Sequence, residues 1–237
     1  MKSKSQRIAG ALCTVSLLVA GAIWWQPGIS AELAVKIPPP LVDETVAPDA
    51  ASETAVLAGG CFWGVQAVFQ HTQGVTRVVS GYAGGAKDTA KYEIVSSGST
   101  GHAEAVKISF DPHKITYGKL LQIYFSVAHD PTQLNRQGPD SGSQYRSAIF
   151  YGNPEQKRIA DSYIAQLDAA KVYRGHVVTQ SVPLNAFYQA EDYHQDYATL
   201  HPAQPYIAIY DLPKIDNLKR MFPAEYREKP VTVAAIK

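Results

Sequence analysis

The stretch Gly59-Gly60-Cys61-Phe62-Trp63-Gly64 joins a short apolar run, 55–58, to a segment whose apolar residues follow helical spacing. The apolar run predicts a strand. The helical spacing is carried by Phe62, Val65, Val68 and Phe69. Two glycines between these elements permit a tight turn and let another molecule approach the backbone closely. The sequence therefore predicts a strand, a glycine turn and a helix that opens at a cysteine.

Cys61 has two interpretations on this pattern alone. Backbone N–H groups at a helix start carry partial positive charge, which stabilises a thiolate and would make Cys61 a nucleophile. A cysteine is also a common small buried residue with no chemical role. The residues around Cys61 leave both interpretations open.

Strands and helices interleave through the rest of the chain with short connections. This order favours an α/β or α+β domain of two layers, with helices packed on a mixed sheet. Strands are predicted over 76–81, 103–110, 146–151 and 177–182, and helices from Thr116 to His129, from Asn153 to about Ala170, and over 191–200.

The composition excludes several classes of function. The chain has 237 residues, of which 46% are hydrophobic and 18% charged, with a net charge of +1. Such a balance provides no basic field that would hold nucleic acid. Two cysteines, Cys13 and Cys61, cannot make a multi-cysteine zinc site, and no metal site is expected. Fourteen tyrosines favour a site or surface built from amphipathic rings.

The N-terminal region predicts export from the cytoplasm. Residues 1–31 combine a basic start with an uncharged run, 8–25, and this pattern fits either a cleaved signal peptide or a membrane anchor. Trp24 and Trp25 at the end of this run are typical of aromatic residues at a membrane–water interface, which favours an anchor. The residues before Ala31 match a signal-peptide cleavage site poorly. Residues 32–53 are rich in proline and are predicted to be a linker. An extracytoplasmic, periplasmic protein is expected, with possible membrane attachment.

Three polar clusters could contribute to a pocket. Glu104 enters an apolar stretch beside His102, and a carboxyl group buried there would be costly to ionise, so it could serve as a general acid. The alternative is an edge-strand charge that faces solvent. The segment 140–146 puts polar groups and Tyr145 on a glycine loop, which is either a site or a solvated turn. His129-Asp130 could assist a cysteine, although a helix stop before a proline is the commoner meaning.

Several ordered motifs resemble the A-type peptide methionine sulfoxide reductases. Gly59 to Gly64 matches the GCFWG turn of that family, and the resemblance extends over 54–227, which leaves 228–237 as a C-terminal tail. The other matching segments are 80–85, 91–93, 98–106, 129–132, 144–147, 190–197 and 204–223.

The resemblance implies an α+β fold, a two-layer sandwich with a ferredoxin-like central plait. It implies reduction of the S epimer of methionine sulfoxide, free or in oxidised proteins. It also implies a role for each matching residue: Cys61 as nucleophile, Glu104 as proton donor, Tyr92 and Tyr145 as hydrogen-bonding partners of the sulfoxide oxygen, Asp140 as an organiser of the polar side, and Phe62 and Trp63 as the apolar wall for the substrate methyl group.

The chain departs from many members of that family in its cysteines. Those members carry recycling cysteines near the C-terminus, whereas this sequence has none after Cys61, and Ser96 stands where some members have another. The resemblance therefore implies that the sulfenic acid on Cys61 is reduced by an external thiol, whether thioredoxin-like, glutaredoxin-like or a small molecule. No bound cofactor is expected, and a monomer is the default expectation.

Two other classes of function compete with the reductase. A cysteine hydrolase or acyltransferase would use Cys61 with His102 or His129 and would need the imidazole close to the thiol. A non-catalytic exported domain would bind methyl or sulfur groups in an aromatic pocket. Binding that survives loss of Cys61, without turnover, would favour the second of these.

Overall fold

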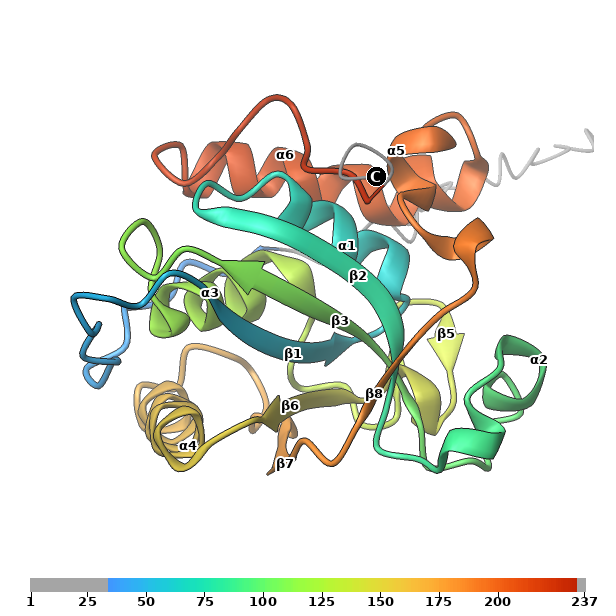
Figure 1. The fold of residues 1–237 in the computed structure, drawn as a ribbon, viewed down its shortest axis with the longest axis horizontal. Helices are drawn as coiled ribbons and strands as arrows, with labels where there is room; N and C mark the ends of the chain where they lie inside the picture. The colour runs from blue at the N-terminus through green and yellow to red at the C-terminus, as the bar shows by residue number, and fades with distance from the viewer. Residues whose placement is uncertain (1–33, 234–237) are drawn as a thin grey trace, which may run out of the picture.

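The computed structural model describes residues 34–233. Its centre is a curled six-stranded sheet in the order β7-β6-β1-β3-β2-β8, with helices packed against it (Figure 1). The predicted signal or anchor segment, 1–31, lies outside the described residues, as do 234–237. Within 34–233, no helix is long and apolar enough to cross a membrane.

Six elements form the centre of the molecule in the chain order strand, helix, strand, strand, helix, strand. They are β1 (Glu53–Gly59), α1 (Phe62–Gln70), β2 (Val75–Ala83), β3 (Ala103–Phe110), α3 (Tyr117–Ile123) and β6 (Ser147–Tyr151). The four strands pair antiparallel in the spatial order β6-β1-β3-β2. This arrangement is a ferredoxin-like plait, and it confirms the predicted α+β fold.

Two short strands extend the sheet, one at each edge, and two more form a separate ribbon. β7 (Gln180–Pro183) adds parallel to β6, which makes the sheet mixed, and β8 (Phe187–Gln189) adds antiparallel to β2. A separate two-stranded ribbon, β4 (Arg136–Gln137) with β5 (Asp140–Ser141), forms inside the predicted polar loop.

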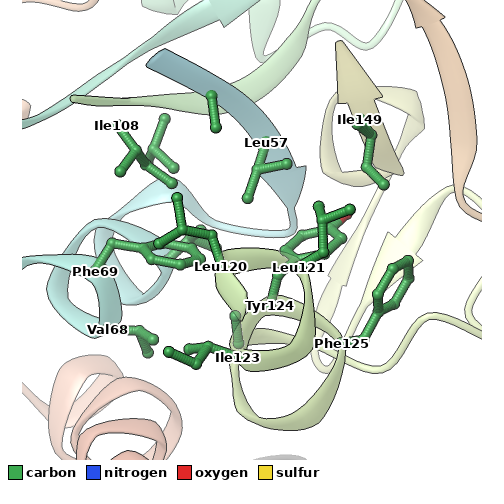
Figure 2. Packing of buried hydrophobic residues seen from close by; sticks show 14 of the residues in the cluster. Leu57, Val68, Phe69, Ile108, Leu120, Leu121, Ile123, Tyr124, Phe125 and Ile149 are labelled. Carbon is green, nitrogen blue, oxygen red and sulfur yellow. The ribbon is translucent and has the colours of Figure 1, made fainter. Parts of the chain in front are cut away.

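The main core lies between the sheet and the helices. Figure 2 shows Leu57 of β1, Ile108 of β3 and Ile149 of β6 facing Leu120 and Tyr124 across this layer, all buried. Alternation along β3 sends Val106, Ile108 and Phe110 to this face, while Ala103 and Ala105 join a smaller cluster on the other face. Because side chains alternate with period two, Glu104 falls on the helical face together with Val106.

Two predicted helix starts are confirmed in detail. The Asn153 side chain accepts a hydrogen bond from the Gln156 N–H at 2.8 Å, which caps α4 (Pro154–Ala169). Thr116 Oγ1 accepts from the Lys119 N–H at 3.2 Å, which caps α3, and a π-helical turn, Tyr124–Ala128, continues that helix.

The C-terminal third differs more from the predictions. The predicted helix over 191–200 is wrong, because the chain makes a 3-10 turn, Asp192–His194, and then α5 (Tyr197–Leu200). The strand predicted at 177–182 begins only at Gln180. Neither α2 (Tyr92–Val95) nor α6 (Leu212–Met221) was predicted, and α6 packs alongside α1 (Figure 1).

The segment before β1 packs on the domain from residue 34 onward. Gln122 Nε2 donates to the Ile37 carbonyl at 3.1 Å, and the Tyr163 hydroxyl donates to the Pro38 carbonyl at 2.7 Å. Asp43 accepts from the Gly118 N–H at 2.8 Å at the start of α3. The described part of the predicted C-terminal tail also docks, since the Val233 N–H donates to Asp196 at 3.0 Å.

Candidate active site

Cys61 lies at the start of α1, directly after β1 and the glycine turn, as the sequence predicts. Gly60 has φ +88°, a left-handed conformation that favours glycine. A Cβ at Gly60 would come within 2.6 Å of the Gln137 side chain. The turn therefore needs glycine both for its backbone shape and for the close packing of Gln137.

Glu104 lies beneath the first turn of the same helix. Its Oε2 accepts a hydrogen bond from the Phe62 N–H at 3.0 Å, and the residue is 3% exposed. Burial raises the pKa of Glu104 to about 8, against the opposing effect of the Phe62 N–H. The alternative of a solvent-facing charge is therefore wrong. Glu104 holds its proton at neutral pH and could donate it to a group bound near Cys61.

The Cys61 thiol is a weaker acid than the helix start alone suggests. Burial raises its pKa well above the ordinary value, and the charges of Glu104, Asp211 and Asp140 act in the same direction. The Trp63 N–H acts in the opposite direction but does not outweigh them. The helix start alone therefore does not make Cys61 a ready thiolate, because burial and the surrounding carboxylates act against its ionisation.

Aromatic rings form one side of the site. Trp63 stacks on Tyr197, with ring centroids 3.9 Å apart, and its Nε1 donates to His194 Nδ1 at 3.3 Å. Phe62 is buried and contacts the rings of Tyr82 and His194. Phe62 and Trp63 are therefore held among aromatic rings next to Cys61, and their implied contact with the substrate methyl group stays a prediction.

Two phenols lie near the site, Tyr92 at the start of α2 and Tyr145 in the 3-10 turn after β5. Burial raises the pKa of Tyr92 and of Tyr145, and in both cases the charges of Glu104 and Cys61 raise it further. Both phenols therefore lie close enough to Cys61 and Glu104 for these charges to act on them. The roles that the resemblance implies for Tyr92 and Tyr145 stay predictions.

Asp140 closes the polar side of the site. It accepts a hydrogen bond from the Tyr206 hydroxyl, and burial raises its pKa against the effects of Tyr206 and Lys214. A narrow depression opens beside the thiol here. It is lined by Cys61, Gln137, Pro139, Asp140, Tyr206, Tyr210 and Lys214.

The segment 190–197 supports this site in ways that sequence reasoning missed. Glu191 accepts from the Tyr82 hydroxyl at 2.9 Å and from the Tyr92 N–H at 3.0 Å. Asp196 accepts from Gln70 Nε2 at 2.6 Å, which ties the segment to α1. The run of polar and aromatic residues in the matching motif was the available signal, but it indicated no particular role.

The two histidines that a hydrolase would need are engaged elsewhere. His102 Nδ1 accepts from the Gly85 N–H at 3.2 Å, and its Nε2 bonds with the Ala86 carbonyl at 2.9 Å. His129 Nε2 bonds with Ser147 Oγ at 2.7 Å, and burial lowers the pKa of His129 to about 3. The geometry therefore does not support a cysteine–histidine hydrolase. No group of three metal-binding side chains occurs within 34–233.

Gly64 offers a test of how closely α6 and its preceding turn approach α1. A Cβ at Gly64 would overlap Oδ1 of the buried Asp211. Helix propensity favours alanine over glycine by about 1 kcal/mol, but overpacking costs about 1–3 kcal/mol. Gly64→Ala is therefore expected to lower the melting temperature.

Gly152→Ala is the control for this prediction, because its Cβ would meet nothing nearer than Gln156 at 3.5 Å. A more stable Gly64→Ala would contradict this packing.

A thiol at a helix start, a neutral buried carboxyl group beside it and an aromatic wall together define a thiol enzyme that can protonate the group it attacks. The family model described as peptide methionine sulfoxide reductase matches residues 53–226. The chain belongs to the peptide methionine sulfoxide reductase family, and it reduces methionine sulfoxide to methionine.

Curated relatives and solved structures agree with this membership. Peptide methionine sulfoxide reductase MsrA 2 of Mesorhizobium japonicum is 64% identical over 192 residues, which cover 81% of this chain and 97% of that protein. The protein of the same name from Synechocystis is 49% identical over 195 residues, covering 81% and 89%.

Among solved structures, the reduced form of Mxr1 from Saccharomyces cerevisiae has a TM-score of 0.59 at 30% identity and covers 67% of this chain and 91% of that one. Methionine sulfoxide reductase A of Corynebacterium diphtheriae has a TM-score of 0.56 at 33% identity, covering 75% and 91%.

Proposed function

We propose that Cys61 attacks the sulfur of the S epimer of methionine sulfoxide while Glu104 protonates the departing oxygen. The observation that carries this proposal is the burial of Glu104 under the first turn of α1, with its pKa at about 8. A sulfoxide is a poor electrophile until its oxygen is protonated. A carboxyl group kept neutral by its surroundings supplies that proton at physiological pH.

The electrons and atoms balance in one transfer. The Cys61 sulfur loses two electrons, and the sulfoxide sulfur gains them. Cys61 gives up its own proton before it attacks. The oxygen then moves to Cys61 with the proton from Glu104, which leaves a sulfenic acid on Cys61, a carboxylate on Glu104 and methionine as the released thioether. Tyr92 and Tyr145 bind the oxygen as it becomes hydroxyl-like. Asp140 organises the polar side, and Phe62 and Trp63 hold the methyl group.

An external thiol completes the cycle in this proposal. The sequence has no cysteine after Cys61, and within 34–233 Cys61 is a free cysteine. One thiol condenses with the sulfenic acid to give a mixed disulfide and water, and a second thiol releases the Cys61 thiol and a disulfide. A thioredoxin-like or glutaredoxin-like protein, or a small thiol, fits this chemistry.

Single-turnover reduction tests this function. The purified full chain, incubated without added thiol, is expected to form one methionine per chain, from the S epimer only, and to stop. Peptide mass spectrometry should then find Cys61 as a sulfenic acid that dimedone traps. Added thioredoxin with its reductase should restart turnover.

Cys13→Ser provides the matched control for that experiment. Because Cys13 lies outside the catalytic domain, this variant is expected to give the same stoichiometry and the same trapped Cys61. A disulfide between Cys13 and Cys61, or more than one methionine per chain, would contradict regeneration from outside the chain. Reduction of both epimers would contradict the proposed stereochemistry.

We also propose that the protein works outside the cytoplasm, attached to the membrane or released by cleavage. The support is the basic start and the uncharged run over 8–25. Expression of the full chain in a Gram-negative host should place the reductase in the membrane or periplasmic fraction. Replacement of Lys2, Lys4 and Arg7 by glutamate is expected to reduce this transfer. A wild-type chain found wholly in the cytosolic fraction would contradict the proposal.

A further inference from the structure

A buried ion pair lies beside Cys61 and has no part in the mechanism above. Lys214 is the cationic residue among those that line the depression next to the thiol. Its Nζ lies 3.8 Å from Asp211 Oδ1, and the two side chains are 7% and 0% exposed. Burying two charges costs several kcal/mol in desolvation, which mutual attraction only partly offsets. Stability alone is therefore a weak explanation for this pair.

The pair is pressed against the helix that carries Cys61. A Cβ at Gly64 would overlap Asp211 and would lie 3.3 Å from Lys214 Nζ. Gly64 follows Cys61 by three residues, in the first turn of α1. The ion pair thus reaches the N-terminal end of the helix through the gap that the last glycine of the GCFWG turn leaves open.

We infer that Lys214, held by Asp211, is a positioning residue that sets how readily Cys61 ionises by offsetting the carboxylates around it. This inference rests on the proposed role of Cys61 and deepens it. Lys214 acts through Asp211 and Asp140 and is not itself a reacting group.

The charges around Cys61 explain why a cation is needed there. The ionisable groups that face the site are Glu104 from β3, Asp140 from β5, Asp211 and Lys214 from the α6 region, Tyr206 and Tyr210 from the segment before it, Tyr92 from α2 and Tyr145 from the 3-10 turn after β5. The carboxylates of Asp211 and Asp140 raise the pKa of Cys61. Lys214 Nζ lies 3.8 Å from Asp211 and its charge also acts on Asp140, so a positive charge sits among the carboxylates that oppose the thiolate. Without Lys214, the site would lose a positive charge that acts against these carboxylates, and the Trp63 N–H would have to offset them.

The thiolate matters in both halves of the catalytic cycle. Cys61 attacks the sulfoxide more readily as a thiolate than as a thiol, and it leaves as a thiolate when a second thiol cleaves the mixed disulfide. A leaving thiolate of lower pKa leaves faster. Lys214 is therefore expected to affect the substrate half-reaction and the regeneration by the same electrostatic route.

The pH dependence of Cys61 alkylation tests the inference. Iodoacetamide reacts with the thiolate, and peptide mass spectrometry of the full chain separates Cys61 from Cys13. Lys214→Met is expected to slow alkylation at pH 8 by about threefold to tenfold, because each pKa unit changes the thiolate fraction by about tenfold. Asp211→Asn should accelerate alkylation, and Lys214→Arg should restore the wild-type profile. Lys219→Met, on the exposed side of α6 with Glu228, is the matched control and should change nothing.

The double variant Asp211→Asn with Lys214→Met separates charge from structural damage. It removes both charges, so its alkylation rate is expected to stay within about twofold of wild type. A Lys214→Met profile identical to that of Lys219→Met would overturn the inference. So would a double variant as slow as Lys214→Met. If Lys214→Met does not fold, Asp211→Asn must still react faster than the double variant, and equal rates would overturn the inference.

The readout also separates this inference from the proposed function. Alkylation reports Cys61 ionisation whether or not Cys61 reduces sulfoxides. If Cys61→Ser still reduced methionine sulfoxide, the proposed function would fail while the alkylation profiles stood. If the profiles did not respond to Lys214, the inference would fail while the proposed function stood.

Discussion

Cys61→Ser is expected to abolish turnover of methionine sulfoxide, lowering the rate by about 10⁴-fold or more. A serine hydroxyl is a much weaker nucleophile than a thiol and cannot cycle through a sulfenic acid. The surroundings predict little loss of stability, because the Cys61 side chain is only partly buried and serine is of similar size. Methionine formation with thioredoxin, its reductase and NADPH present measures the effect.

Substrate binding should survive that change. The apolar wall of Phe62 and Trp63 and the phenols of Tyr92 and Tyr145 remain in place in Cys61→Ser. The Kd for a peptide with the S sulfoxide, measured by calorimetry, is therefore expected to stay within a few-fold of the wild-type value. Cys13→Ser should keep full activity. Turnover retained by Cys61→Ser would reject the nucleophile and favour a binding domain with activity from another source.

Local patterns in the sequence were sufficient for most individual strands and helices, whereas the plait and the roles of Cys61 and Glu104 came from the family resemblance. The alternation of apolar residues along 103–110 defines β3 and places Glu104 on the helical face. The glycines before Cys61 mark a turn that the positive φ of Gly60 confirms. These features depend on neighbours within a few residues, which a single sequence displays.

The acidity of Cys61 depends on residues that are distant in sequence. Helix-start geometry favours the thiolate, and the sequence shows this geometry. Burial, together with Glu104, Asp140 and Asp211, favours the thiol instead, and these carboxylates come from three separate segments. The structure was needed to find that the second effect is the larger.

The segment 191–200 failed as a helix for a similar reason. Asp196 adopts φ +58°, which breaks a helix, and its backbone N–H donates to Gln66 on α1 at 2.9 Å. Gln195 accepts from Gln66 and from the Ser80 N–H, both in the core. Helical spacing of apolar residues gave no sign that these polar side chains would be buried against α1 and β2. Tertiary contacts outweighed local propensity.

Glu104→Gln is expected to slow sulfoxide reduction by about 10²–10⁴-fold, because an amide cannot deliver a proton to the departing oxygen. Its Oε1 can still accept from the Phe62 N–H, so the local structure should persist. The measurement is the single-turnover rate of methionine formation across pH 6–10. Turnover unchanged at neutral pH would remove Glu104 from its assigned role.

The pH profile of the wild type follows from the order of the two pKa values. The reactive state holds one proton between Glu104, with a pKa of about 8, and Cys61, with a higher pKa. This state is most populated between the two values, so kcat/KM should rise as pH passes 8 and fall only above the pKa of Cys61. In Glu104→Gln the residual rate should rise with the Cys61 thiolate alone, without the alkaline fall.

Alkylation of Cys61 should respond to Glu104→Gln in the opposite direction. The negative charge of Glu104 raises the pKa of Cys61, and glutamine removes that charge. At pH 9, where wild-type Glu104 is mostly ionised, the variant is therefore expected to react faster with iodoacetamide while it reduces sulfoxide more slowly. A damaged site would lose both reactivities or expose the thiol at every pH. If Cys61 is alkylated faster in Glu104→Gln while sulfoxide reduction is lost, Glu104 is the proton donor and Cys61 is the nucleophile.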